Sequence, residues 1–179
     1  MKKVTSEFIR DIFYSGQIGF SSDVEITNKI AFLINQNYLI LTKVHIASKT
    51  EYLDISSDQT LLATRSEASG GGSAHIALKL LAEKHLLNEY GVCSLFEQPF
   101  SGFIPDVRSS DGHIICECGH TDNAEKIFTY LRHPDIRHVI QIPYPDDESD
   151  EIIGYEFQAQ PDLFNFLKIE SADKIQKIK

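Results

Sequence analysis

The stretch that decides the fold runs from residue 104 to residue 119 and reads IPDVRSSDGHIICECG. Its Asp111-Gly112 pair lies between two apolar runs, which is the strongest short-range signal for a β-hairpin. The second run alternates with a period of two, so its side chains point in turn to the two faces of a sheet. We therefore expect Asp106 and Glu117 on neighbouring strands, facing the same side.

These two acids cannot both stay charged at close range without help. Two carboxylates about 4 Å apart repel by roughly 4 kcal/mol at an effective dielectric constant near 20. Either one of them keeps a proton or a cation lies between them. Oxygen ligands at strand ends suit a hard divalent cation such as Mg²⁺. Asp106 and Glu117 are therefore candidate metal ligands.

The flanking sequence predicts a mixed α+β arrangement around this hairpin. Its apolar residues recur at helical spacing in two segments and at strand spacing in the others. A helix opens the region, a three-stranded meander follows, and a second helix leads to a further strand. The predicted elements are helix 74–90, strands 92–98, 102–108 and 113–119, helix 121–132, strand 137–142, strand 151–158 and a terminal helix from 161.

A Pro-Asp, a hairpin and then Glu-x-Lys at the end of the next strand is the signature of the PD-(D/E)XK nuclease superfamily, which residues 74 to 142 resemble. The resemblance implies a restriction-endonuclease-like core that cleaves DNA or RNA with Mg²⁺ or Mn²⁺. It makes Asp106 and Glu117 the metal ligands, with the backbone carbonyl of Cys118 as a third. Gly119 stands where the family has the lysine that orients and activates the attacking water.

Two residues are candidates to complete such a site. His120 follows Glu117 closely and would replace the missing base, although an exposed loop histidine is the simpler interpretation. Glu83 lies on the first helix, where these nucleases often place an acid, although it could instead pair with Lys79 four residues earlier. We expect Lys126, off the apolar face of its helix, to be a solvated lysine. The predicted catalytic residues are Asp106, Glu117, His120 and Glu83.

The chain divides into three parts at this level. Residues 1–66 are expected to form a β-rich N-terminal region, either scaffold or a substrate-binding or dimerisation module. Residues 67–73 are rich in Gly and Ser and predict a linker. Residues 74–179 contain the nuclease-like core and a C-terminal helix. Strands are expected in the first part at 31–34, 38–46, 50–55 and 59–64, after a short helix at 5–14.

Charge argues against the nucleic-acid hypothesis. The chain has 17 Lys and Arg against 26 Asp and Glu, a net charge of −9, whereas phosphate contacts dominate nucleic-acid affinity. Part of the excess is local, in the acidic run 146–151. No apolar run approaches the roughly 20 residues of a membrane span, and three cysteines indicate a reducing compartment. We therefore expect a cytoplasmic protein without a membrane partner.

Three functional hypotheses remain at this stage. The first is a metal-dependent nuclease that acts on DNA or RNA, with DNA favoured over RNA and a homodimer as an open possibility for its assembly. The second is a non-catalytic nuclease-like module for binding or assembly, which Gly119 and the acidic surface favour. The third is a zinc-stabilised domain built on Cys116, Cys118 and His120, although buried, inert cysteines are the simpler interpretation.

Overall fold

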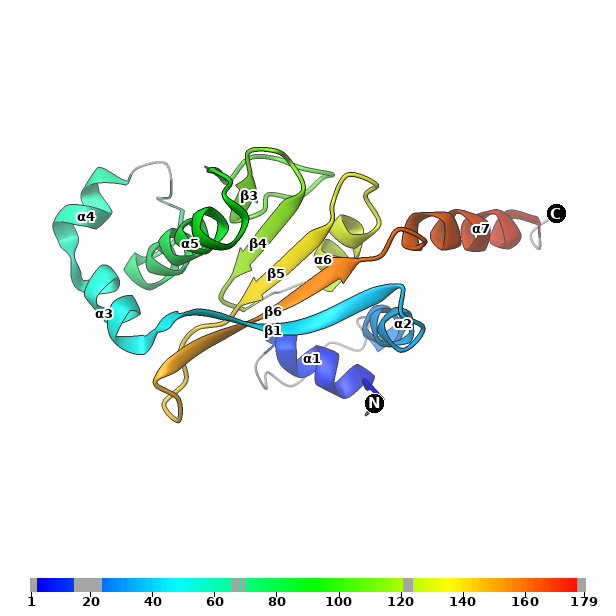
Figure 1. The fold of residues 1–179 in the computed structure, drawn as a ribbon, viewed down its shortest axis with the longest axis horizontal. Coiled ribbons are helices and arrows are strands. Elements are labelled where there is room, and N and C mark those ends of the chain that lie inside the picture. Colours follow the sequence, from blue (N-terminus) through cyan, green and yellow to red (C-terminus); the bar gives the residue numbers. More distant parts are fainter. Residues whose placement is uncertain (1–2, 15–23, 66–67, 69, 121–123, 177–179) are drawn as a thin grey trace.

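The computed structural model describes residues 3–14, 24–65, 68, 70–120 and 124–176. It is a mixed α+β fold around one six-stranded sheet with the strand order β1-β6-β5-β4-β3-β2 (Figure 1). Only β4 and β5 pair in parallel, and the other neighbours are antiparallel. The strands are β1 (Leu39–Ser48), β2 (Ser94–Phe96), β3 (Val107–Ser109), β4 (Ile114–Cys118), β5 (His138–Ile142) and β6 (Glu151–Ala159).

The predicted order of elements in the C-terminal two thirds is confirmed. A helix is followed by the antiparallel strands β2, β3 and β4, then by a second helix and by β5. The first helix ends in one turn of π-helix before Gly91, which adopts the left-handed conformation. The helices here are α5 (Ser73–His85), the π-turn η3 (Leu86–Tyr90), α6 (Ala124–Leu131) and α7 (Leu163–Gln176).

Helices cover both faces of the sheet, and β4 lies between the two helical layers. All five residues of β4 are buried. Ile115 packs into the core that α1, α2 and α6 share, whereas Ile114 and Cys116 pack into the core on the α5 side. The alternation predicted from sequence therefore holds, with both strand faces apolar, as expected of a central strand flanked by helices.

The β-rich prediction for residues 1–66 is wrong. The described residues of this region, 3–14 and 24–65, form four helices and a single strand, and that strand, β1, pairs with β6 in the same sheet as the hairpin (Figure 1). The short helix expected at 5–14 is present. The helices are α1 (Ser6–Tyr14), α2 (Val24–Asn35), α3 (Lys49–Ser57) and α4 (Gln59–Thr64).

Two local signals explain the error. In α2, Thr27, Ile30, Ala31 and Ile34 are buried, which is helical spacing, although residues 30–34 taken alone resemble a strand. At the start of α3, the Ser48 side chain accepts a hydrogen bond from the Glu51 amide at 3.2 Å, a helix cap that ends the strand. A short apolar run is ambiguous unless the residues around it are counted.

Among the described residues, no helix combines the length and the apolar character needed to cross a bilayer. The segment expected as a linker is partly packed, since Ala68 is fully buried against the α5 side of the sheet.

Candidate functional site

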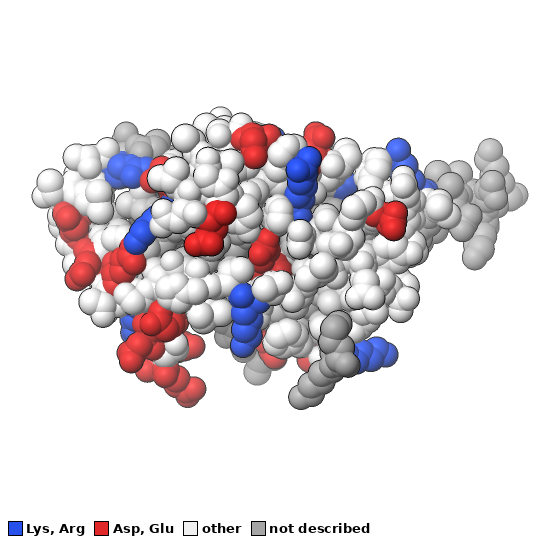
Figure 2. All heavy atoms as spheres, viewed as in Figure 1, with Lys and Arg blue, Asp and Glu red and all other residues white. Residues whose placement is uncertain are grey.

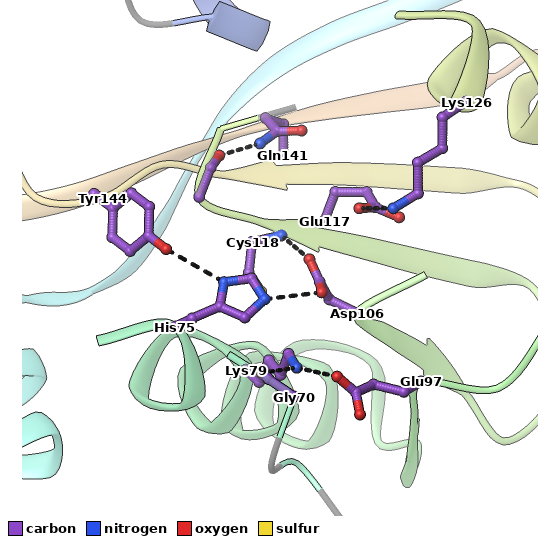
Figure 3. Close-up of polar contacts among 11 residues, drawn as sticks. Gly70, His75, Lys79, Glu97, Asp106, Glu117, Cys118, Lys126, Gln141 and Tyr144 are labelled. Carbon is purple, nitrogen blue, oxygen red and sulfur yellow. Dashed lines mark hydrogen bonds and ion pairs between the residues drawn. The ribbon is translucent and has the colours of Figure 1, made fainter. Parts of the chain in front are cut away.

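Asp106 lies where β3 and β4 separate. The register of these strands ends at the Val107–Cys116 pair. Beyond it, the amide of Cys118 donates to Asp106 Oδ2 at 2.8 Å, and Nε2 of His75 on α5 lies 3.0 Å from Oδ1 (Figure 3). The amide and carbonyl of one strand residue point to the same side. The Cys118 carbonyl is therefore directed toward the strand that carries Asp106.

Glu117 is held from the other face of the sheet, by α6, so the expectation that Asp106 and Glu117 face the same side is wrong. Its Oε2 lies 2.6 Å from Nζ of Lys126, which reaches down from α6 (Figure 3). The Glu117 side chain is only 6% exposed and that of Asp106 16% exposed. Oε1 of Glu117 is buried, and the Tyr130 hydroxyl acts on this carboxylate as a side-chain hydrogen-bond partner that lowers its pKa. The carboxylate thus has two side-chain partners, Lys126 and Tyr130.

The two acids have opposite pKa shifts. Burial, and then the charge of Asp106, raise the pKa of Glu117 to about 8, although Lys126 opposes this rise. Burial would also raise the pKa of Asp106, but the hydrogen bonds from His75 and from the Cys118 amide outweigh it and leave the pKa below its usual value. At neutral pH Asp106 is therefore charged, and Glu117 largely keeps its proton.

The Tyr130 hydroxyl is a second buried polar group at this place. Tyr130 is fully buried on α6, and its hydroxyl interacts with the Glu117 carboxylate as a hydrogen-bond partner. Burial, then the charge of Glu117 and this hydrogen bond, raise the pKa of Tyr130, so the hydroxyl stays protonated.

Tyr144 occupies the space beside Gly119. Gly119 has a φ of +78°, and a Cβ built on it would lie 2.6 Å from Cε2 of Tyr144. A side chain at this position would therefore meet both backbone strain and a ring. The Tyr144 hydroxyl lies 3.4 Å from Nδ1 of His75, whose other nitrogen faces Asp106 (Figure 3).

The structure separates the other two predicted site residues from the Asp106 carboxylate. His120 is exposed, with its ring edge-on to Tyr144 at a centroid distance of 5.4 Å. Glu83 pairs with Arg65 at 2.7 Å and accepts from the Ser94 hydroxyl at 3.0 Å. The alternative partner expected for Glu83, Lys79, contacts other groups.

Lys79 is fully buried beneath the Gly-rich segment. Its Nζ lies 2.5 Å from Oε1 of Glu97 and 2.6 Å from the carbonyl of Gly70. A Cβ on Gly70 would collide with the Glu97 carboxylate, so the segment needs a glycine there. This buried ion pair organises the start of α5 next to His75.

Sequence reasoning missed His75 and Lys126. His75, Lys79 and Glu83 recur every four residues on α5, and each contacts a polar group from another element. This spacing was a usable signal, because polar residues on one helical stripe need partners. Lys126 had no such signal: its contact with Glu117 depends on how α6 crosses the sheet.

The chemistry of Asp106, Glu117 and the Cys118 carbonyl suits a hard divalent cation. The two neighbouring acids and the Cys118 carbonyl, which points toward Asp106, offer oxygen ligands. Among the described residues, no three side chains of His, Cys, Asp and Glu are gathered to hold a metal. The fit therefore depends on a backbone carbonyl. Burial raises the pKa of the Cys116 thiol, which does not favour the zinc alternative.

Comparisons of the whole chain with models of protein families, with curated proteins and with solved structures find no match.

Proposed function

We propose that the protein is a cytoplasmic, divalent-metal-dependent phosphodiesterase of the PD-(D/E)XK type that cleaves DNA. One observation carries the proposal: Lys126 Nζ lies 2.6 Å from Glu117, next to Asp106. The family resemblance implies a site of two acids and a lysine. In this chain Gly119 stands at the position of that lysine, and Lys126 on α6 would supply the ammonium group instead.

The arrangement of elements supports the same proposal. α5 is followed by the antiparallel meander β2-β3-β4, α6 crosses one face, and β5 pairs in parallel with β4. This order is the one expected for a restriction-endonuclease-like core. It brings Asp106 and Glu117 to the place where two neighbouring strands diverge, which is where a substrate could approach the strand ends.

Asp106, Glu117 and the Cys118 carbonyl would hold Mg²⁺ or Mn²⁺. When bound, such an ion polarises a phosphoryl oxygen and lowers the pKa of water. Lys126 keeps a positive charge beside Glu117, which favours the ionised carboxylate and the negative charge that develops on a phosphate. His75 orients the Asp106 carboxylate through Nε2, and its Nδ1 can exchange a proton with the Tyr144 hydroxyl.

Nicking of supercoiled plasmid in the presence of Mn²⁺ tests the proposal. We expect the wild type to nick the plasmid and Asp106→Asn to lose at least about 100-fold in rate, because a site residue acting directly on the reacting groups typically contributes that much. Addition of EDTA should abolish the reaction.

Asp147→Asn is the matched control, since Asp147 is a fully exposed acid that forms a 3.6 Å ion pair with Lys49, away from Asp106. This variant should nick at the wild-type rate. Equal rates for wild type and Asp106→Asn, or no metal-dependent nicking by the wild type, would exclude the proposal.

A non-catalytic binding module is the second candidate, and burial of the site favours it. The Asp106 and Glu117 side chains are 16% and 6% exposed, and both Asp106 oxygens already accept hydrogen bonds. Its signature is DNA or protein binding that persists in EDTA and in Glu117→Gln. Binding that requires the metal would count against this candidate.

A further inference from the structure

A second cluster of titratable residues lies on the α5 side of the sheet, whereas Glu117 contacts Lys126 of α6 on the other face. The cluster includes His138 at the start of β5 and Glu156 in β6. Next to His138 is a cavity of about 370 Å³ between η3 and the strands β1 and β6. It is lined by Val44, His45, His85, Glu89, Tyr90 and Glu156. None of these residues belongs to the site proposed above.

Glu156 is held as an oriented anion at this cavity. Nδ1 of His138 lies 2.5 Å from Oε1, and the Tyr90 hydroxyl donates to the same oxygen at 2.9 Å. The hydrogen bond from His138 is the main reason that the pKa of Glu156 is lowered. Both donors serve one oxygen of the carboxylate, Oε1, so its other oxygen, Oε2, can accept from a further group.

His85 gives a separate indication that a ligand binds here. The residue is 7% exposed and lines the cavity, and its Nε2 is buried without a hydrogen-bonding partner among the described residues. Burial lowers the pKa of His85, so the ring is neutral at pH 7 and one nitrogen is an acceptor. A buried acceptor without a donor is costly unless a bound molecule completes it.

The charge of the cavity selects the kind of ligand. Neither Lys nor Arg is found among the described residues that line it, and Glu89 on η3 adds an exposed carboxylate. His45 is bound to a further acid, Glu151, at 2.5 Å. Acidic side chains are visible over the region between α5 and β6 in Figure 2. Such a cavity attracts cations and repels phosphate.

We propose that this cavity binds an alkylammonium group. Glu156 and Glu89 would supply the charge, Nε2 of His85 would accept an ammonium N–H, and the ring of Tyr90 would contact the alkyl stem. The rings of His85 and His138 stand edge-on to Tyr90, with centroids at 6.0 and 5.4 Å, and fix its position. The ammonium group belongs either to a free diamine or to a lysine side chain of a partner protein.

Calorimetric titration with putrescine tests the proposal, with NMR of the His85 ring as a local readout. We expect millimolar or tighter binding that shifts the His85 resonances. Glu89→Gln should weaken binding about fivefold, because it removes one exposed carboxylate near the ammonium. Glu25→Gln, an exposed helical glutamate on α2, is the matched control and should bind as the wild type does.

A parallel titration with Nα-acetyl-lysine methylamide separates the two sources. Tighter binding of the lysine compound assigns the cavity to a partner's lysine, and tighter binding of putrescine assigns it to a free diamine. The proposal is overturned if neither compound binds at millimolar concentration, if the His85 resonances do not move, or if Glu89→Gln and Glu25→Gln bind equally well.

Discussion

Glu117 in β4 and Glu156 in β6 are two carboxylates that the fold holds away from bulk water, on opposite faces of the sheet. Glu117 has a lysine 2.6 Å away and still has a raised pKa, whereas Glu156 accepts hydrogen bonds from His138 and Tyr90 and has a lowered pKa. The difference lies in what else is present: Glu117 is more deeply buried and faces the charge of Asp106. At Glu117, the neighbouring acid and desolvation raise the pKa more than the salt bridge lowers it. A salt bridge alone is therefore a poor guide to the charge of a residue in a buried cluster.

Of the changes considered for these two carboxylates, removal of Lys126 should have the largest effect on activity and stability. Lys126→Met should lower plasmid nicking at least about 100-fold, since the ammonium beside Glu117 is lost. At pH 9, above the pKa of Glu117, the variant should also lose about 3 kcal/mol of unfolding free energy, because a charged carboxylate is left buried and unpaired.

Urea unfolding at pH 5 and at pH 9 measures the second effect, and nicking assays at pH 7 measure the first. Lys84→Met is the matched control, because Lys84 forms an exposed ion pair with Glu51 on the surface. A stability loss for Lys126→Met that is the same at both pH values would show that Glu117 does not titrate as described.

Glu117→Gln should remove a pH dependence of stability. The folded pKa of about 8 lies above the unfolded value of about 4.3. Between these values the folded state binds more protons, so the unfolding free energy of the wild type falls as the pH rises. The contribution is on the order of 3 kcal/mol between pH 5 and pH 8. Urea denaturation across this range should show a flatter profile for the variant.

Gly119→Ala should lower the unfolding free energy by about 2 kcal/mol. The new Cβ would adopt a left-handed φ and would meet the Tyr144 ring, which in turn contacts His75. Gly72→Ala is the matched control, because a Cβ at Gly72 meets no atom within 4 Å. Thermal denaturation of both variants checks the prediction, and equal melting temperatures would contradict it.

Glu156→Gln should have the smallest effect, about 1 kcal/mol at pH 7, and the opposite pH dependence. The lowered pKa of Glu156 means that its stabilisation is present above the unfolded pKa and is lost as the pH falls through the folded value. The difference between wild type and variant should therefore shrink in acid denaturation below about pH 4. If the stability difference between wild type and Glu156→Gln grew as the pH fell, the pKa of Glu156 would be raised, as that of Glu117 is, and not lowered.

Sequence alone was sufficient for the elements whose signals are local. The Asp111-Gly112 turn and the alternation in β4 predicted the hairpin, and apolar periodicity predicted α5 and α6. It was insufficient where contacts are long-range. Lys126 lies off the apolar stripe of α6, which usually indicates solvent, and only the crossing of α6 over β4 brings it to Glu117.

The secondary-structure prediction for the N-terminal third was wrong for a different physical reason. Its apolar runs are too short to distinguish strand from helix, and capping by Ser48 decides where β1 ends. The site was likewise predicted only in part. The hairpin register brings Asp106 and Glu117 near each other, but Glu117 points to α6 on the other face, and His75 reaches Asp106 only through the packing of α5 on the sheet.

The pairing of β1 with β6 matters to anyone who wishes to shorten this protein. A fragment that begins at residue 74 would keep the hairpin and both of its helices but would lose the neighbour of β6, which spans Glu151–Ala159. The freed backbone groups would then be available to other polypeptides, and uncovered apolar side chains would accompany them. Trimming to the apparent core should therefore give material that aggregates, so biochemical work should keep the chain whole.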